Sequence, residues 1–395
     1  MIESKRRILT QFLESHAREQ LEFVIELCDQ NSYSYNKRGA DRAGQLIASR
    51  MEGLLPHHQV MARKKVGDFH IYRSGASGAA VYLVGHLDTV FPPGHEFQKC
   101  RVDGDLLHGP GTGDMKGGLA VIVYALKALA HAELLSQLDV VLIVNSDEEI
   151  GSAGSESLFL EERKNAAACL VAECAGLDGE LVVSRNGKLG GRIDSFGCDR
   201  HVGDGTHEKS SAILELAHRI IVLESLNASQ PGVSLNVGKI EGGLAPNTVP
   251  AKASALVDVR WREQVHKRDL LEKIHKTLDQ PVQAGCRTEF TVLNSRPAMP
   301  FTRGGEDLYS LARRAGRLLG LEIGSQHRRG TSDANFFAAS GVPTLDGFGP
   351  VCRFDHTAAE QIRISSLLER SKLMAHFLFE YGLDKGLIPH REGEA

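Results

Sequence analysis

Seven histidine and carboxylate side chains stand where apolar stretches of the sequence end or in later loops, and their types are those that bind divalent metal ions. Each is a weak signal by itself, because an isolated acid or histidine is more often a solvated or structural residue. Together, two histidines and three carboxylates form a ligand set suited to a pair of ions such as zinc, and a further carboxylate could act as general base. The candidates are His86, Asp88, Asp114, Glu148, Glu149, Glu173 and His356.

The spacing within this set indicates how some members share the chemistry. In an extended chain His86 and Asp88 lie on one side, so Asp88 could orient the imidazole ring of His86. One carboxylate could bridge two ions held about 3.5–4 Å apart. Glu148 and Glu149 are adjacent, so one could bind metal while the other faces the water that is to be activated.

Strands that alternate with helices are expected to position these residues. Apolar runs predict strands at 81–85, 139–144 and 168–172, and residues 117–132 have the length and composition of a buried helix. This alternation predicts an α/β fold, a mostly parallel sheet with helices on both faces. Because ligands collect beyond the carboxyl ends of such strands, the site is expected at that edge of the sheet.

A second pattern interrupts the first between residues 185 and 297. It predicts strands at 189–197, 233–240, 251–260 and 287–294, with helices at 209–224 and 267–278. The order βαββαβ is that of a ferredoxin-like domain. We therefore predict a catalytic domain formed by residues 1–184 and 298–395, with an inserted domain at 185–297. In its first helix, the apolar face is expected to contain Ile213, Leu216, Ala217, Ile220 and Leu223.

Composition excludes several other classes of protein. A chain of 395 residues fits two domains, and its net charge of −4 gives no basic face for nucleic acid. The sequence contains no run of about 18 apolar residues, so no membrane-spanning helix is predicted. The seven cysteines are odd in number and scattered, which favours reduced thiols in a reducing compartment. With no signal peptide recognised, a cytoplasmic location is expected.

Five longer motifs make the sequence resemble a known family. They are GHLDTV (85–90), GPGTGDMKGG (109–118), NSDEEIGSAGSE (145–156), GGLAPNTVPA (242–251) and GTSDANFFAASGVPTLDGFGP (330–350). In this order they resemble the dizinc metallopeptidases that include glutamate carboxypeptidase (carboxypeptidase G), aminoacylase, acetylornithine deacetylase and succinyl-diaminopimelate desuccinylase. The resemblance runs from about residue 30 to 380 and is nearest to the glutamate carboxypeptidase branch.

The resemblance implies a role for each candidate. His86 and Glu173 would complete the shell of one Zn²⁺, Glu149 and His356 that of a second, and Asp114 would bridge the two. Co²⁺ and Mn²⁺ are the expected substitutes. Asp88 would support His86, and Glu148 would be the general base that takes a proton from water and returns it to the leaving amine. A cis peptide bond is expected between Asp114 and Met115.

The inserted domain resembles the family's dimerisation lid. In a homodimer, His201 would reach the partner subunit's active site and polarise the scissile carbonyl, while Asn247 and Arg260 would meet the substrate. Two departures from the family pattern concern charge. Arg200 precedes His201, and Arg353 and Asp355 stand beside His356, where they form either an exposed ion pair or a specificity element.

Three functions remain open at the level of sequence. The first is a carboxypeptidase that cuts an amide bond next to a free carboxylate and releases a C-terminal amino acid such as glutamate from an N-acyl or peptide substrate. The second is a deacylase that removes an acyl group from an amino acid. The third is a metal-free binding module on the same fold, which would be expected to have lost ligands that this sequence retains.

Overall fold

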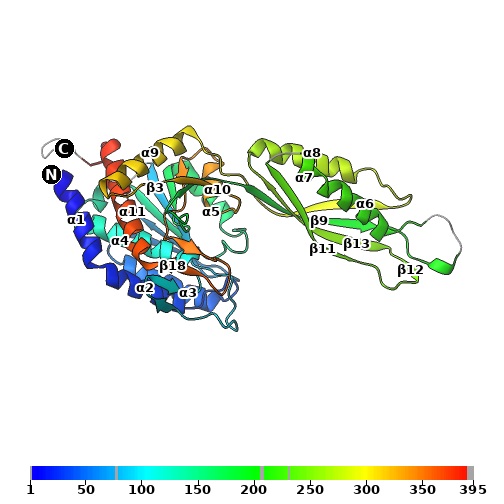
Figure 1. Ribbon diagram of the computed structural model, residues 1–395, viewed down its shortest axis with the longest axis horizontal. Coiled ribbons are helices and arrows are strands. Elements are labelled where there is room, and N and C mark those ends of the chain that lie inside the picture. The colour runs from blue at the N-terminus through cyan, green and yellow to red at the C-terminus, as the bar shows by residue number, and fades with distance from the viewer. Residues whose placement is uncertain (1, 76–78, 205–208, 230–231, 389–395) are drawn as a thin grey trace. The chain divides into compact units, whose positions relative to one another are not determined.

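The computed structural model describes residues 2–75, 79–204, 209–229 and 232–388 (Figure 1). The chain divides into two compact units. The first unit comprises Met1–Ser184, Phe301–His327 and Ser332–Ala395, and the second comprises Arg185–Pro300 and Arg328–Thr331. The second unit thus consists of one long segment and a short additional one.

A six-stranded sheet forms the centre of the first unit. Its order is β1-β2-β6-β3-β7-β16, in which β6, β3, β7 and β16 run parallel and β2 pairs antiparallel with β1 and β6. The mostly parallel sheet predicted from sequence is thus confirmed. The strands are β1 (His57–Met61), β2 (Phe69–Arg73), β3 (Ala80–His86), β6 (Val140–Asn145), β7 (Ala166–Val171) and β16 (Thr344–Leu345).

Helices cover both faces of this sheet, as expected (Figure 1). On one face α4 packs against α1, α2 and α11 over a continuous apolar core that includes Leu83 and Leu170. On the other, Phe337 of α10 lies 5.6 Å from the rings of both Tyr82 in β3 and Phe159 in α5. The helices are α1 (Ile2–Ser15), α2 (Ala17–Asp29), α3 (Lys37–Met51), α4 (Gly117–His131), α5 (Glu156–Glu162), α9 (Arg303–Leu318), α10 (Ala334–Ala338) and α11 (Ile364–Asp384).

Two smaller sheets complete the strand pairing around the first unit. The order β17-β18-β5-β4 joins a late segment of the chain to the strands that precede α4, and β15 pairs with β8. Their bounds are β4 (Arg101–Asp103), β5 (Leu106–His108), β17 (Cys352–Arg353), β18 (Gln361–Arg363), β8 (Leu181–Arg185) and β15 (Ser325–Arg328).

The second unit has the predicted ferredoxin-like order. Its four long strands form an antiparallel sheet of order β11-β13-β9-β14, with α6 and α8 packed on it. The elements are β9 (Gly187–Phe196), α6 (Ala212–Glu224), β11 (Val233–Gly242), β13 (Lys252–Trp261), α8 (Gln264–Leu278) and β14 (Arg287–Arg296), together with β10 (Arg200–His201), α7 (Leu226–Ser229) and β12 (Thr248–Val249).

The buried face of α6 differs from the expected one. Leu216 and Leu223 are buried, but Ile213 is exposed and Glu215 is fully buried. Glu215 bonds Arg219 and accepts the backbone N–H groups of residues 282 and 283. An acid on this face is tolerated because its oxygens are satisfied by charged and backbone donors. Apolar periodicity alone could not reveal that pairing.

In the described part of the chain, no helix has both the length and the apolar character needed to cross a membrane.

Candidate metal centre

Parallel strands bring three of the candidate segments to one edge of the sheet. β3 ends at His86, β6 ends at Asn145 just before Glu148 and Glu149, and β7 ends two residues before Glu173. Asp114 lies in the turn of Thr112–Lys116 that leads directly into α4. Its peptide bond to Met115 is cis, as the resemblance implied. His356 lies in the turn between β17 and β18.

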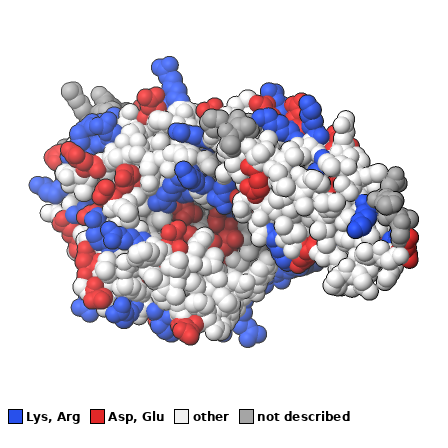
Figure 2. Space-filling view, turned by 45° about the vertical axis from the view of Figure 1, so that its right-hand side comes forward, with Lys and Arg blue, Asp and Glu red and all other residues white. Residues whose placement is uncertain are grey.

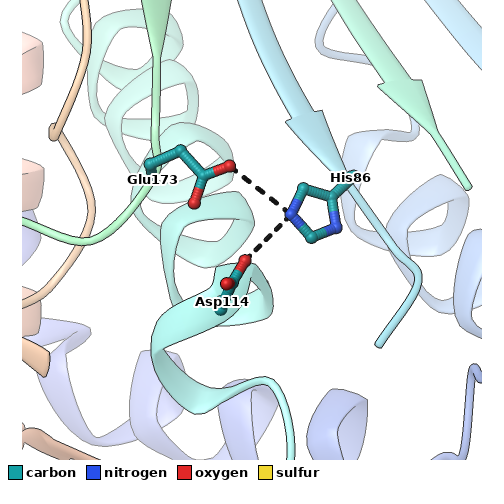
Figure 3. A group of neighbouring side chains, drawn as sticks. All are labelled: His86, Asp114 and Glu173. Atoms are coloured by element: carbon teal, nitrogen blue, oxygen red, sulfur yellow. Dashed lines mark hydrogen bonds and ion pairs between the residues drawn. The ribbon is translucent and has the colours of Figure 1, made fainter. Parts of the chain in front are cut away.

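His86, Asp114 and Glu173 form the first of two ligand groups (Figure 3). The Nε2 atom of His86 lies 3.0 Å from Oδ1 of Asp114 and 3.5 Å from Oε1 of Glu173. The side chain of His86 is almost fully buried, and that of Glu173 is 9% exposed. One nitrogen and two oxygen ligands therefore converge from three separate segments.

Asp114, Glu149 and His356 form the second group. The Nε2 atom of His356 lies 3.0 Å from Oδ2 of Asp114 and 3.0 Å from Oε2 of Glu149. The two oxygens of Asp114 thus face different histidines, which is the arrangement of a bridging carboxylate. His356 has a backbone φ of +60°, a left-handed conformation that is uncommon for residues other than glycine.

The protonation of His86 provides a test of whether these residues fit a metal ion. Its Nδ1–H donates to the backbone carbonyl oxygen of Asp88 at 3.0 Å, since a carbonyl can only accept. In the neutral ring Nε2 then points a lone pair at the carboxylates of Asp114 and Glu173. That arrangement is repulsive unless a proton or a cation lies between them. A divalent ion satisfies all three groups, and the set of nitrogen and oxygen ligands suits zinc.

The acid–base properties of the cluster follow from burial and from crowded charge. Burial, together with the Asp114 charge, raises the pKa of Glu149 to about 8 and the pKa of Glu173 well above its usual range. Hydrogen bonds to Asp114 and Glu149 raise the pKa of His356 to about 11. Although burial lowers the pKa of His86, its carboxylate partners raise it well above 6.5. Without metal, protons occupy positions that an ion would take, so metal binding is expected to release them.

Acidic side chains also gather visibly at the surface. Figure 2 shows them in a hollow near the centre of the face presented, with basic side chains along the upper rim. A concentration of negative charge in a concave surface attracts cations.

Asp88 lies beside His86 and has further partners that the sequence did not reveal. Its Oδ1 lies 3.4 Å from Nδ1 of His86, farther than the backbone oxygen that receives the hydrogen bond. The carboxylate instead accepts the backbone N–H groups of Glu148 at 3.2 Å and Glu149 at 3.1 Å, and the hydroxyl of Ser34 at 2.8 Å. The fully buried Asp88 therefore joins the end of β3 to the segment that carries both glutamates.

Glu360 is a buried acid that sequence reasoning missed. It lies four residues after His356, and its carboxylate accepts three backbone N–H groups from the loop that carries Asp114. Burial and the Asp114 charge raise the pKa of Glu360 to about 8. The available signal was an acid within the same late loop as a candidate ligand, but its partners lie about 250 residues away in sequence.

Two candidates from the second unit lie side by side. The strand of Arg200–His201 pairs with Thr248–Val249, and the N–H of Val202 donates to the carbonyl oxygen of Asn247 at 3.0 Å. The Nδ1 atom of His201 accepts the N–H of Gly203 at 3.0 Å. The neutral ring then carries its proton on Nε2, and His201 is exposed. Such a ring can donate a hydrogen bond to a carbonyl oxygen.

Arg260 lies away from that pair within the second unit. β12, which pairs with the strand of His201, ends three residues before Lys252, the first residue of β13. Arg260 lies near the other end of β13, about 25 Å from Lys252 for an extended strand. The guanidinium of Arg260 donates to Asp258 at 2.8 Å and to the carbonyl oxygen of Arg329 at 3.1 Å. The structure therefore brings His201 and Asn247 together but not Arg260.

The charged residues beside His356 are both exposed. Neither Arg353 nor Asp355 forms an ion pair with any residue of the described chain. The alternative of an exposed ion pair at this place is thus not supported.

Curated relatives share most of their length with this chain. Carboxypeptidase G2 of Pseudomonas sp. (strain RS-16) is 28% identical over 319 residues, which cover 79% of this chain and 76% of that protein. Succinyl-diaminopimelate desuccinylase of Pseudoalteromonas atlantica is 29% identical over 324 residues, which cover 76% of this chain and 83% of that protein.

The fold and the family model agree with these similarities. A tripeptidase from Staphylococcus aureus superposes with a TM-score of 0.75 and 21% identity, covering 92% of this chain and 98% of that one, which shows a common fold. The model of peptidase family M20/M25/M40 matches residues 82–380, well over half of the chain. The chain therefore belongs to peptidase family M20/M25/M40 and is a hydrolase of its metal-dependent peptidase and deacylase type.

Proposed function

We propose that this protein uses two zinc ions to cut an amide bond next to a free carboxylate and to release a C-terminal amino acid. The observation that carries the proposal is the position of Asp114. Each of its oxygens lies 3.0 Å from the Nε2 atom of a different histidine, and each histidine lies beside a further acid. Two adjacent sites that share one carboxylate suit a pair of ions.

The chain's own residues supply the rest of the chemistry. Bound ions in such a site polarise a carbonyl group and acidify water. Glu148 follows β6 beside the ligand Glu149, and both backbone N–H groups are held by Asp88. We assign to Glu148 the role of general base, which takes a proton from the attacking water and returns it to the leaving amine. His201 would donate a hydrogen bond to the developing oxyanion.

Two observations support the proposed substrate class: residues that could bind a free carboxylate of the substrate, and the activities for which the relatives are named. Arg260 offers a planar fork suited to a carboxylate, and Asn247 offers an amide. The carboxypeptidase G2 similarity favours release of an amino acid such as glutamate from an acyl or peptide donor. The alternative, removal of an acyl group from an amino acid, is favoured by the similarity to the desuccinylase.

We further propose a homodimer formed through the second unit. β11 lies at an edge of its sheet, and exposed apolar side chains on α6 and around β11 include Ile221 at 69%, Ile240 at 58% and Leu244 at 93% exposure. Because Arg260 is distant from His201 and Asn247 in one subunit, we assign His201 and Asn247 to the partner's site. In light scattering, Ile221→Glu should yield monomers, whereas Leu318→Glu in the first unit should not; dimers of Ile221→Glu would contradict the interface.

The decisive experiment combines metal analysis with a substrate panel. Acyl-glutamates, dipeptides, N-acetyl amino acids and a succinylated diamino acid are compared in protein loaded with Zn²⁺, Co²⁺ or Mn²⁺. Glu148→Gln should keep two ions per chain and lose about 10²–10⁴-fold in kcat. The exposed Glu156→Gln serves as a control. Retained turnover in Glu148→Gln would refute the base assignment, and no turnover of any glutamate conjugate would refute the carboxypeptidase assignment.

A cytoplasmic location is also proposed, since the seven cysteines are odd in number and scattered. Fractionation of cells tests it, and recovery outside the cytoplasmic fraction would contradict it.

A further inference from the structure

Glu360 is a buried carboxylate to which the proposed chemistry gives no part. Its exposed fraction is 1%, and it lies directly before β18. It precedes Gln361, which pairs with His108 at the end of β5. The antiparallel pairing of β18 with β5 therefore places Glu360 opposite the first residues of the glycine-rich loop that follows β5.

Four backbone N–H groups of the glycine-rich loop donate to Glu360. The Oε2 atom of Glu360 accepts the N–H of Gly111 at 3.0 Å, and Oε1 accepts the N–H of Gly113 at 2.9 Å and of Asp114 at 3.2 Å. Its backbone oxygen accepts the N–H of Gly109 at 3.2 Å. Gly111 has a φ of +75°, so the loop turns sharply and presents its N–H groups inward.

The same residue is tied to the turn that carries His356. The N–H of Glu360 donates to the carbonyl oxygen of Thr357 at 3.1 Å, and the N–H of Thr357 donates to Phe354 at 3.2 Å. Glu360 thus connects two segments that each contribute a group to the second ligand site. His86 and Glu173 depend on it less, because His86 ends β3 and Glu173 lies just after β7 in the central sheet.

We propose that Glu360 is a positioning residue that holds Asp114 at the correct distance from His356 and thereby forms the second ion site. The inference rests on the proposed pair of metal ions. It concerns the geometry of the loop rather than the chemical step, since the carboxylate of Glu360 accepts three backbone N–H groups from the loop that carries Asp114. Residues that orient metal ligands in this way change metal affinity by about 10–100-fold when replaced.

Two variants separate position from charge. Glu360→Gln keeps the size of the side chain but replaces one accepting oxygen with an NH₂ group, which faces an N–H donor. Glu360→Asp keeps the charge but is one methylene group shorter. A positioning role is impaired in both variants, whereas a role of charge alone is preserved in the aspartate.

Glu162→Gln is the matched control. Glu162 is also a buried glutamate, and it accepts hydrogen bonds from Arg73 and Tyr82 away from the metal centre. Its replacement measures the general effect of losing a buried carboxylate in the first unit.

The test titrates metal-free protein with Zn²⁺ against a competing chelator, and with Co²⁺ while the visible spectrum is recorded. In both Glu360 variants the second ion should bind about 10–100-fold more weakly. The first ion should be weakened less, because it shares Asp114 but keeps His86 and Glu173 on the central sheet. Hydrogen exchange of the metal-free variants should be about tenfold faster at the amides of Gly111, Gly113 and Asp114. Glu162→Gln should leave both readouts unchanged.

Each other outcome has a distinct meaning. Wild-type affinity for both ions in the two variants would overturn the proposal, as would recovery of the second site in Glu360→Asp. Equal weakening of both ions with loss of overall stability would also overturn it, in favour of a general structural role. If the wild-type protein itself binds fewer than two ions, the two-ion function fails while the exchange measurement still tests the bonds of Glu360.

Discussion

Replacing Gly118 by alanine tests how closely α4 must approach the strand that leads into Glu173. Gly118 is the second residue of α4, and a Cβ atom built there would lie 1.8 Å from the carbonyl oxygen of Ala172. Ordinary van der Waals contact begins at 3.4 Å, so helix and strand would have to separate by about 1.6 Å. The obstructing atom belongs to the backbone, which cannot rotate away as a side chain can.

The size of the effect follows from the packing of α4. Twelve of its fifteen residues are buried, so the helix has little room to move. Overpacking of this kind costs about 1–3 kcal/mol, against a gain of at most ~1 kcal/mol from the helix propensity of alanine. Gly305 provides a matched control, because it is the third residue of α9 and its Cβ would meet nothing closer than 3.5 Å. Gly305→Ala should be neutral or slightly stabilising.

Thermal unfolding of both metal-free variants measures the difference. Gly118→Ala should unfold at least ~3 °C below Gly305→Ala, since 1 kcal/mol corresponds to about 2–4 °C in a domain of 150–250 residues. It should also lose about 100-fold in kcat/KM, because a displacement of Ala172 carries Glu173 with it. Equal midpoints and equal activity in the two variants would refute the argument from close packing.

Two further predictions concern stability in the first unit. Glu133 lies two residues after the end of α4 and has a φ of +57°. Because glycine adopts this conformation without strain, Glu133→Gly should raise the free energy of unfolding by ~1 kcal/mol in denaturant unfolding. A lower stability would contradict this. Burial and the charges of Arg6 and Lys372 lower the pKa of His376 from 6.5 to about 4. Below pH 6.5 the unfolded chain therefore binds a proton that the folded protein does not, and stability falls as the pH drops towards 4, by up to about 3 kcal/mol. His376→Gln should lose this part of the pH dependence, and parallel stability curves for variant and wild type would contradict it.

The parts of the fold and site that could be predicted are those that produce a pattern in neighbouring residues of the sequence. The strands ending near His86, Asn145 and Val171 are continuous apolar runs, which predicted the strands themselves. The alternation of these strands with helices predicted that they run parallel. Because parallel strands share one edge, the convergence of ligands that follow them was expected. The same holds for the ferredoxin-like order of the second unit.

The parts that could not be predicted depend on contacts between distant residues. Glu360 contacts Gly111 across about 250 positions, and Asp88 bonds the backbone of Glu148 across 60. Neither contact produces a periodic pattern of apolar residues in the sequence. The buried Glu215 of α6 is a similar case, since its partners lie in a loop more than sixty residues later.

Two buried carboxylates outside the proposed ligand set hold its segments together. Asp88 joins the end of β3 to the backbone of Glu148 and Glu149, and Glu360 joins the Asp114 loop to the His356 turn. Each satisfies backbone N–H groups that would otherwise be costly to bury. These bonds use backbone N–H groups and no atom of a proposed ligand side chain. We therefore expect them to hold the segments of His86 and Glu149 together, and those of Asp114 and His356 together, when the ions are removed. Chelation should therefore abolish activity at once and leave the unfolding temperature within a few degrees of the loaded protein at low metal concentration, whereas a collapse of the fold on chelation would show that the ions, and not these carboxylates, hold the segments.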